Sequence, residues 1–134
     1  MRNFYRTVFA VTAAAFLAAS ATMPSHAVPR HREAVPSPAF DGLWSVSIMT
    51  QYGDCNRGYR YPLRIVDGYV TKADVDPSYV VAGAVARTGA IGVTVSGGGQ
   101  TANGVGRLGR NVGRGIWRTS NGECRGNWTA ERRG

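Results

Sequence analysis

The stretch GIWRTSNGECRGNW, from Gly115 to Trp128, carries the strongest fold signal in the chain. It contains two copies of the tripeptide Gly-x-Trp, one on either side of Asn121-Gly122. Asn-Gly between two alternating segments is the strongest short-range signal for a β-hairpin with a two-residue turn. Before the turn, Arg114, Ile116 and Arg118 alternate with glycine and tryptophan, which is the two-residue period of a β-strand. The stretch therefore predicts a hairpin of two antiparallel strands.

The same alternation, interrupted by turn residues, continues upstream as far as Phe40. It predicts eight strands, at residues 44–48, 59–65, 69–71, 79–86, 91–95, 100–108, 112–119 and 123–131. None of these segments shows a 3.6-residue apolar period long enough for a helix. The pattern predicts an all-β fold, an antiparallel up-and-down meander of about eight short strands. We expect the meander to close into a barrel, because closure removes exposed strand edges; a two-sheet sandwich is the alternative.

Each tryptophan of the chain lies two residues after a glycine. The three copies of this motif are Gly42-Leu43-Trp44, Gly115-Ile116-Trp117 and Gly126-Asn127-Trp128. The first copy is on the first predicted strand, and the other two are on the last two strands. Since the first and last strands of a closed meander are neighbours, we expect the motif to serve barrel closure, with Trp44 meeting Trp128. The glycines would let a strand bend or let an indole lie over the backbone. A ligand-binding role for the motif is the alternative.

The first 27 residues are typical of a secretory signal peptide. A basic start is followed by a charge-free apolar run at residues 7–19, and small residues suit cleavage after Ala27. Cleavage after Ala21 also fits the sequence, and an uncleaved anchor is the alternative. We expect an exported protein, periplasmic or secreted, with no transmembrane segment after cleavage. Residues 28–39 contain three prolines and predict a disordered linker, and residues 40–134 predict a single β-barrel domain.

Cys55 and Cys124 are the two cysteines of the chain. An exported protein meets an oxidising compartment, and two cysteines allow one pairing. We therefore expect one disulfide that supports a small core, with two buried free thiols as the alternative.

Residue types suited to catalysis or to cofactor binding are scarce after residue 27. His31 is the one histidine there and lies in the predicted linker, so a Ser/His or Cys/His pair is not available. Gly104–Gly109 matches the dinucleotide fingerprint G-x-G-x-x-G, but the fingerprint needs a following helix and a strand is predicted instead. A haem iron would need His31, Met49 or a tyrosine as its ligand. We expect no enzyme activity, no cofactor and no metal.

Positive charge is concentrated in the second half of the chain. The formal net charge is +8, and cleavage after Ala27 would remove Arg2 and Arg6 and leave +6. Residues 87–134 hold eight arginines against two glutamates, whereas residues 28–86 are balanced. Five of these arginines recur through the last three predicted strands and are candidates for anion binding: Arg107, Arg110, Arg114, Arg118 and Arg125.

An exported basic surface favours particular partners. Nucleic acid is not expected there, whereas lipopolysaccharide, another anionic envelope glycan or an acidic protein would be attracted by the accumulated potential. Solubility is the alternative explanation for the charge.

Small residues gather in the middle of the predicted domain, at Ala82, Gly83, Ala84, Gly92, Gly104 and Gly106. Small inward side chains leave room for a ligand in a barrel, but glycines in barrel strands also mark bends and bulges. We expect packing rather than a pocket.

The segments Phe40–Val46, Tyr59–Gly68, GRGIW and CRGNWTAERR resemble a group of small exported β-rich proteins of rhizobia and related alphaproteobacteria. The resemblance covers nearly all of residues 40–133 and implies export; some members carry labels of haem utilisation or adhesion. In outline the chain is also similar to small periplasmic metalloprotease inhibitors, one-disulfide barrels with Gly-x-Trp on the first strand and an N-terminal arm that enters the protease cleft. Lipocalin-like and avidin-like barrels share the same Gly-x-Trp start.

Together these features predict an exported, non-enzymatic binding or adhesion module that engages anionic envelope components through its arginine-rich second half. A periplasmic protease inhibitor that uses residues 28–39 as its arm is the alternative.

Overall fold

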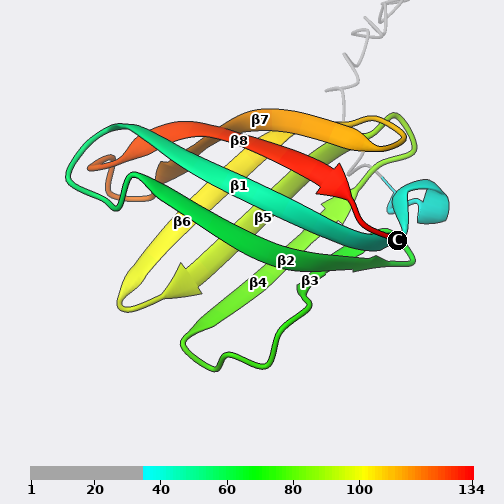
Figure 1. Ribbon diagram of the computed structural model, residues 1–134, viewed down its shortest axis with the longest axis horizontal. Coiled ribbons are helices and arrows are strands. Elements are labelled where there is room, and N and C mark those ends of the chain that lie inside the picture. Colours follow the sequence, from blue (N-terminus) through cyan, green and yellow to red (C-terminus); the bar gives the residue numbers. More distant parts are fainter. Residues whose placement is uncertain (1–34) are drawn as a thin grey trace, which may run out of the picture. The chain divides into compact units, whose positions relative to one another are not determined.

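The alternating segments form eight strands in the computed structural model, which describes residues 35–134 (Figure 1). The strands are β1 Gly42–Tyr52, β2 Gly58–Val66, β3 Tyr69–Lys72, β4 Tyr79–Val85, β5 Ala90–Gly97, β6 Gln100–Leu108, β7 Val112–Thr119 and β8 Arg125–Arg132. Each strand pairs antiparallel with the next, and β8 pairs with β1, which closes the barrel. The predicted all-β meander barrel is confirmed. The predicted signal peptide and residues 28–34, with His31, lie outside the described residues.

One end of the barrel is filled by core side chains beneath a short 3-10 helix, η1 Pro38–Phe40. Trp44 is 1% exposed, and its indole Nε1 donates a hydrogen bond of 2.9 Å to the carbonyl oxygen of Phe40. The guanidinium of Arg132, opposite Trp44 on β8, lies 5.1 Å from the indole and donates to the carbonyl oxygen of Ala39. These contacts join the start of β1, the end of β8 and η1 into one closed end.

Ordered structure begins before residue 40. Pro36 forms a bridge with Ala86, and the backbone N–H of Ser37 donates to the carbonyl oxygen of Val85 at 2.8 Å. The sequence places residues 36–39 in a disordered linker, whereas in the structure they pack along the end of β4 and enter η1. The difference arises because β4 ends with free backbone groups that this proline-containing segment can pair.

The two Gly-x-Trp motifs of the last hairpin interlock through their register. Gly115 is paired with Trp128 and Trp117 with Gly126, so each tryptophan lies opposite the glycine of the other motif. A Cβ atom at Gly115 would lie 2.5 Å from Cε2 of Trp128, and one at Gly126 would lie 2.9 Å from Nε1 of Trp117. Each indole therefore occupies space that only a glycine leaves free.

The indole N–H groups of these two tryptophans donate hydrogen bonds to backbone carbonyl oxygens on other strands of the barrel. Trp117 donates to the carbonyl oxygen of Met49 on β1 at 3.1 Å, across the β1–β8 seam. Trp128 donates in the other direction, to the carbonyl oxygens of Val105 and Ile116 at 3.2 Å each. Trp44 and Trp128 are not cross-strand partners: Trp128 is opposite Ile48, four residues further along β1 than Trp44. The motif thus links β6, β7, β8 and β1, while Trp44 separately serves the closed end.

The predicted disulfide is confirmed. Cys55, in the β1–β2 loop, is bonded to Cys124, just before β8, with a Cα–Cα distance of 6.2 Å. Both cysteines lie at the end of the barrel opposite η1, so the bond ties two loops of that end together.

Candidate functional site

The barrel contains a cavity of about 590 Å³. Its lining includes loop residues Cys55, Asp76, Ser78 and Gly98, so the cavity lies toward the end of the barrel opposite η1. Its aliphatic lining consists of Val46, Ile48, Leu63, Val81, Ile91, Val93, Val95 and Ala102. This volume lies within the range of small-molecule sites, about 300–1,000 Å³. The expectation that packing fills the barrel is therefore wrong.

The position of small residues explains this difference. Ala102 and Gly104 line the cavity from β6, where they face inward and leave room. Ala82 and Gly92, which the sequence suggested as cavity formers, are exposed on the outer surface. Gly106 lies beneath the indole of Trp128. Only small side chains at inward-facing positions of a strand leave space in the barrel. Composition alone does not show which positions face inward.

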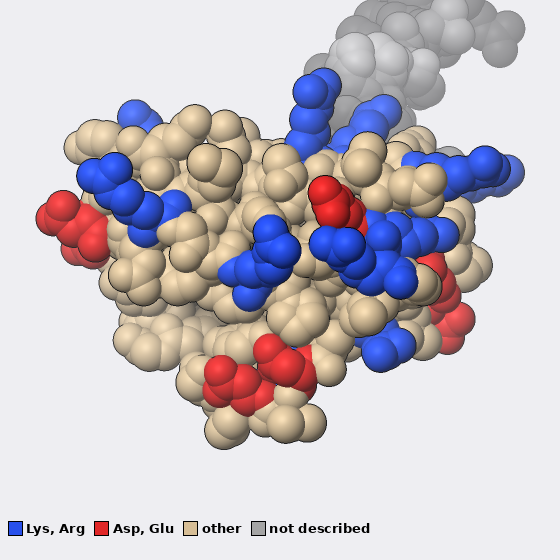
Figure 2. Space-filling model, in the orientation of Figure 1, with Lys and Arg blue, Asp and Glu red and all other residues tan. Residues whose placement is uncertain are grey.

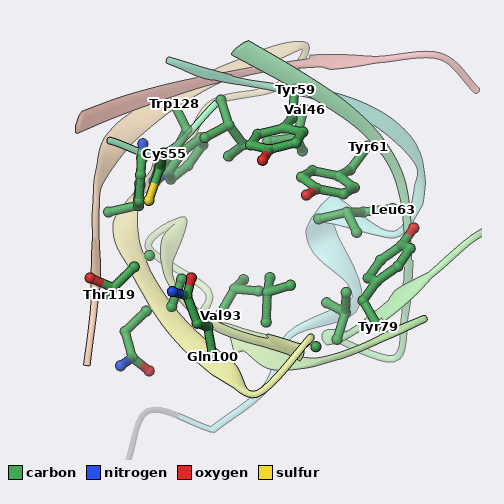
Figure 3. Close-up of a pocket in the computed structure, with 18 of the residues that line it drawn as sticks. Val46, Cys55, Tyr59, Tyr61, Leu63, Tyr79, Val93, Gln100, Thr119 and Trp128 are labelled. Carbon is green, nitrogen blue, oxygen red and sulfur yellow. The ribbon is translucent and has the colours of Figure 1, made fainter. Parts of the chain in front are cut away.

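Three tyrosines form one side of the cavity (Figure 3). The rings of Tyr59 and Tyr61 stack at a centroid distance of 5.8 Å, and Tyr61 meets Tyr79 at 5.3 Å. The hydroxyls of Tyr59 and Tyr61 point into the cavity, whereas that of Tyr79 points away from it (Figure 3). Burial, followed by the neighbouring Tyr59, raises the pKa of Tyr61 above its ordinary value of 10.0. A tyrosine hydroxyl is protonated at neutral pH and can donate a hydrogen bond to a ligand.

The tyrosine cluster lies where the barrel wall is incomplete. β3 is four residues long and reaches only Leu63 on β2 and Gly83 on β4. Residues 58–62 of β2 and 79–82 of β4 therefore have a ladder partner on one side only. Pro62, which lacks an N–H, lies in this part of β2, in agreement with the tendency of proline to avoid fully paired strands. The backbone N–H of Ala73 donates to the carbonyl oxygen of Pro62 at 3.0 Å just beyond the β3 ladder, and the tyrosine side chains lie at the gap that remains.

The loop between β3 and β4 is fastened beside the tyrosines. The hydroxyl of Tyr79 donates a hydrogen bond of 2.5 Å to the carboxylate of Asp74. The ammonium of Lys72 donates to the carbonyl oxygens of Asp76 and Tyr79 and lies 4.9 Å from the Tyr79 ring centroid. Desolvation, followed by the bond to Asp74, raises the pKa of Tyr79. A backbone hydrogen bond from Ser78 lowers the pKa of Asp76.

Indole rings and polar groups complete the lining. Trp117 and Trp128 line the cavity from β7 and β8, with Trp128 on the same side as Tyr59, whereas Gln100 and Thr119 form the wall across from the tyrosines (Figure 3). The Thr119 hydroxyl is already bonded to the backbone of Cys124, so the Gln100 amide is the polar group of this wall best placed to meet a ligand.

Positive charge is kept out of the cavity. Within residues 35–134, the cavity lining includes no arginine or lysine, and Asp76 is its one charged member. All five candidate arginines are exposed on the outside. The basic side chains in Figure 2 are spread over the outer wall, and an acidic group lies at its lower edge, over the β3–β4 loop.

The outer arginines form two cross-strand pairs. Arg107 on β6 is opposite Arg114 on β7, and Arg118 on β7 is opposite Arg125 on β8. Arg110 lies apart from them, in the β6–β7 turn. Arg125 also lies over the ring of Tyr52, 4.8 Å from its centroid. The structure thus brings four of the five predicted residues together on one surface.

The described residues contain no cluster of three or more His, Cys, Asp or Glu side chains that could hold a metal ion. Among the same residues, no helix is long and apolar enough to span a membrane. Of the described residues named as candidate haem ligands, Met49 is 61% exposed on the outer face of β1 and does not line the cavity, whereas Tyr59, Tyr61 and Tyr79 do line it.

Comparison of the chain with protein-family models, curated proteins and solved structures finds no match. The resemblance to exported rhizobial proteins stays an expectation, and function has to be inferred from the geometry.

Sequence reasoning missed the cavity, although two signals for it were present. Tyr59, Tyr61 and Tyr79 share the inward parity of their strands, and Ala102 and Gly104 share it on β6, across the barrel. These two groups of residues indicate a cavity only when it is known that their strands face each other across the barrel.

Proposed function

We propose that this protein is an exported, non-enzymatic binding protein whose barrel cavity takes an uncharged, largely apolar small molecule that contains a flat ring. The observation that carries the proposal is the 590 Å³ cavity, lined by aliphatic and aromatic side chains and free of arginine and lysine among the described residues.

The lining favours this ligand chemistry for three reasons. Aliphatic side chains favour burial of an apolar body at about 25 cal/mol per Å². The rings of Tyr59 and Tyr61 can stack on a flat ligand ring, and their hydroxyls can donate hydrogen bonds to it. A carboxylate or phosphate would lose its hydration beside Asp76 with no cation in the lining to compensate, which disfavours anionic ligands.

A matched pair of substitutions tests the cavity. Ala102→Trp places an indole into the cavity, and Ala82→Trp places the same side chain on the outer face of β4. The probe is N-phenyl-1-naphthylamine, a neutral aromatic dye that fluoresces in apolar sites. We expect the unmodified protein and Ala82→Trp to enhance its fluorescence with equal affinity, and Ala102→Trp to weaken binding at least about tenfold, a loss of 1.4 kcal/mol.

An anionic analogue of the dye tests whether the cavity prefers uncharged ligands. 8-Anilino-1-naphthalenesulfonate has the same ring system with one sulfonate, and its binding should be insensitive to Ala102→Trp because the outer arginines attract it. The proposal fails if the neutral dye does not bind, or if both tryptophan variants reduce its binding equally while circular dichroism shows both to be folded.

A second function is favoured by the arginine pairs on the outer wall. Like charges directly opposite each other in a sheet are destabilising, yet Arg107–Arg114 and Arg118–Arg125 are two such pairs on one surface. We propose that this surface binds an anionic component of the cell envelope, which would offset the repulsion. Weakening of that binding by salt is its first test.

Protease inhibition remains the alternative prediction. Residues 28–34 of the proposed arm lie outside the described residues, and Pro36 and Ser37 pair with the end of β4 and the residue after it. Deleting residues 28–34 would abolish inhibition of an envelope metalloprotease if the arm acts, but would leave dye and anion binding intact.

A further inference from the structure

Three rows of outward-facing side chains cross strands β6, β7 and β8. Two arginine rows, Arg107–Arg114 and Arg118–Arg125, follow directly from the cross-strand register. The row between them pairs Val105 with Ile116 and continues through an asparagine to Met49 on β1. Neighbouring rows are two residues apart along a strand, about 7 Å, so the two arginine rows are about 13 Å apart.

Three of the four side chains in the middle row are apolar and exposed. Val105 is 54% exposed, and Ile116 and Met49 are each 61% exposed. On a soluble surface, apolar side chains bounded on both sides by cations are the arrangement typical of interfacial membrane contact. Tyr52, 59% exposed beside Arg125, adds an amphipathic ring at the edge of this surface.

Negative charge is missing from this part of the wall. Among the described residues, the three rows contain no Asp or Glu. Glu131, on the outer face of β8 beyond the rows, is paired with Arg133 at 3.1 Å. The four arginines are therefore left to meet an external anion.

We infer that this surface, hereafter the docking face, binds the barrel to an anionic lipid bilayer. The inference rests on the anion-binding function proposed above and names its partner. Arginine guanidinium groups form paired hydrogen bonds with phosphate oxygens of lipid headgroups. Val105, Ile116 and Met49 enter the interface between those headgroups, where apolar side chains are stabilised. A soluble acidic glycan would satisfy the arginines but would leave the apolar row exposed to water, so the row favours lipid.

The experiment measures flotation of the full chain with vesicles of phosphatidylcholine, with and without phosphatidylglycerol. We expect binding to the vesicles that contain phosphatidylglycerol and little binding to the neutral ones. The N-terminal residues are common to all variants compared, so differences between variants report on the barrel.

Charge is tested with two double variants that lose the same net charge. Arg107→Gln with Arg114→Gln removes one row of the docking face. Arg64→Gln with Arg87→Gln removes two exposed arginines that lie in none of the three rows, one on β2 and one just after β4. Each arginine at a membrane surface contributes about fivefold in affinity, so the first variant should bind about 25-fold more weakly. The Arg64/Arg87 variant should change less than about threefold, because its arginines lie outside the docking face.

The apolar row is tested at high salt, where the electrostatic attraction is screened. Ile116→Asn should remove the binding that remains at high salt. Val80→Asn, at a valine 63% exposed on β4, should not. Equal losses in the two double variants, or unchanged high-salt binding in Ile116→Asn, would overturn the docking face.

Two further outcomes separate the proposals. Heparin binding that depends on Arg107 and Arg114, without vesicle binding, would show that the partner is an acidic glycan; the lipid inference would then be wrong while anion binding stands. If the protein binds neither heparin nor vesicles, both the anion-binding proposal and the lipid inference are refuted. Binding of N-phenyl-1-naphthylamine should be the same in all these variants, which reports that they are folded and that the cavity function is independent.

Discussion

Substitution of Gly115 by alanine should disrupt the interlock of the two Gly-x-Trp motifs. The added Cβ would lie 2.5 Å from Cε2 of Trp128 and would also press on the backbone carbonyl oxygen of Val105. An indole could turn aside at some cost, but a backbone oxygen in the centre of a closed sheet cannot. Relief would require β6 and β7 to separate locally, which weakens the ladder on which the Trp128 hydrogen bonds depend.

The expected loss of unfolding free energy in Gly115→Ala is the sum of two opposing contributions. Overpacking a well-filled site costs typically 1–3 kcal/mol, and contact with backbone places this site near about 3 kcal/mol. Alanine also restricts the unfolded chain more than glycine does, a gain of about 0.5–1 kcal/mol. The net destabilisation should be about 2 kcal/mol, which for a domain of this size lowers Tm by roughly 10 °C.

Gly92→Ala is the matched control. Gly92 is exposed on β5, and a Cβ there would have nothing within 4 Å. In Gly92→Ala the added methyl group meets no other atom, so its one effect is to restrict the unfolded chain. The unfolding free energy should therefore be unchanged or about 0.5 kcal/mol higher. Urea unfolding followed by circular dichroism and tryptophan fluorescence gives both free energies. If Gly115→Ala lies within about 0.5 kcal/mol of Gly92→Ala, the indole does not occupy the space assigned to it, and the interlock is refuted.

Two further predictions concern covalent and ionisable groups. Replacing Cys55 and Cys124 by alanine opens a cross-link between residues 69 apart and should lower the unfolding free energy by about 4 kcal/mol on the chain-entropy model, measured by urea unfolding against the oxidised protein. Because the pKa of Tyr79 is raised above its ordinary value of 10.0, the folded protein retains a proton that the unfolded chain releases; this stability is complete below pH 10 and is lost as pH rises further. Unfolding free energy should therefore fall above about pH 10, and Tyr79→Phe should flatten that fall, whereas Tyr69→Phe, at an exposed outward tyrosine, should retain it. An unchanged alkaline slope in Tyr79→Phe would contradict the assignment.

Much of the fold could be predicted from local sequence. Alternation and turn residues located all eight strands, since a half-buried strand needs one apolar side chain in every two residues. Asn121-Gly122 marked the position of the β7–β8 turn, although this connection spans residues 120–124 rather than the two residues predicted. The alternation of Arg114, Ile116 and Arg118 with glycine and tryptophan is confirmed by their common exposure on β7. The disulfide followed from a count of two cysteines in a chain expected to be exported.

The cavity and the docking face could not be derived in this way, because each depends on which residues of different strands meet. Ala102 and Gly104 leave space only because their parity turns them inward, across the barrel from Tyr61. The arginine rows exist only because the β6–β7 turn sets Arg107 opposite Arg114. A shift of one residue in that register would turn a whole strand over and exchange its inner and outer faces.

The sequence by itself therefore determined the strands and their order, since alternation and turns depend on neighbours along the chain. It also predicted the disulfide from the cysteine count, and it favoured a closed meander because closure removes exposed strand edges. The tertiary structure alone decided that the barrel is hollow, that the tyrosines gather at the gap beside the short β3, and that an apolar row lies between two rows of arginines. These properties arise from side chains brought together by register and closure, and closure is a constraint on all eight strands at once.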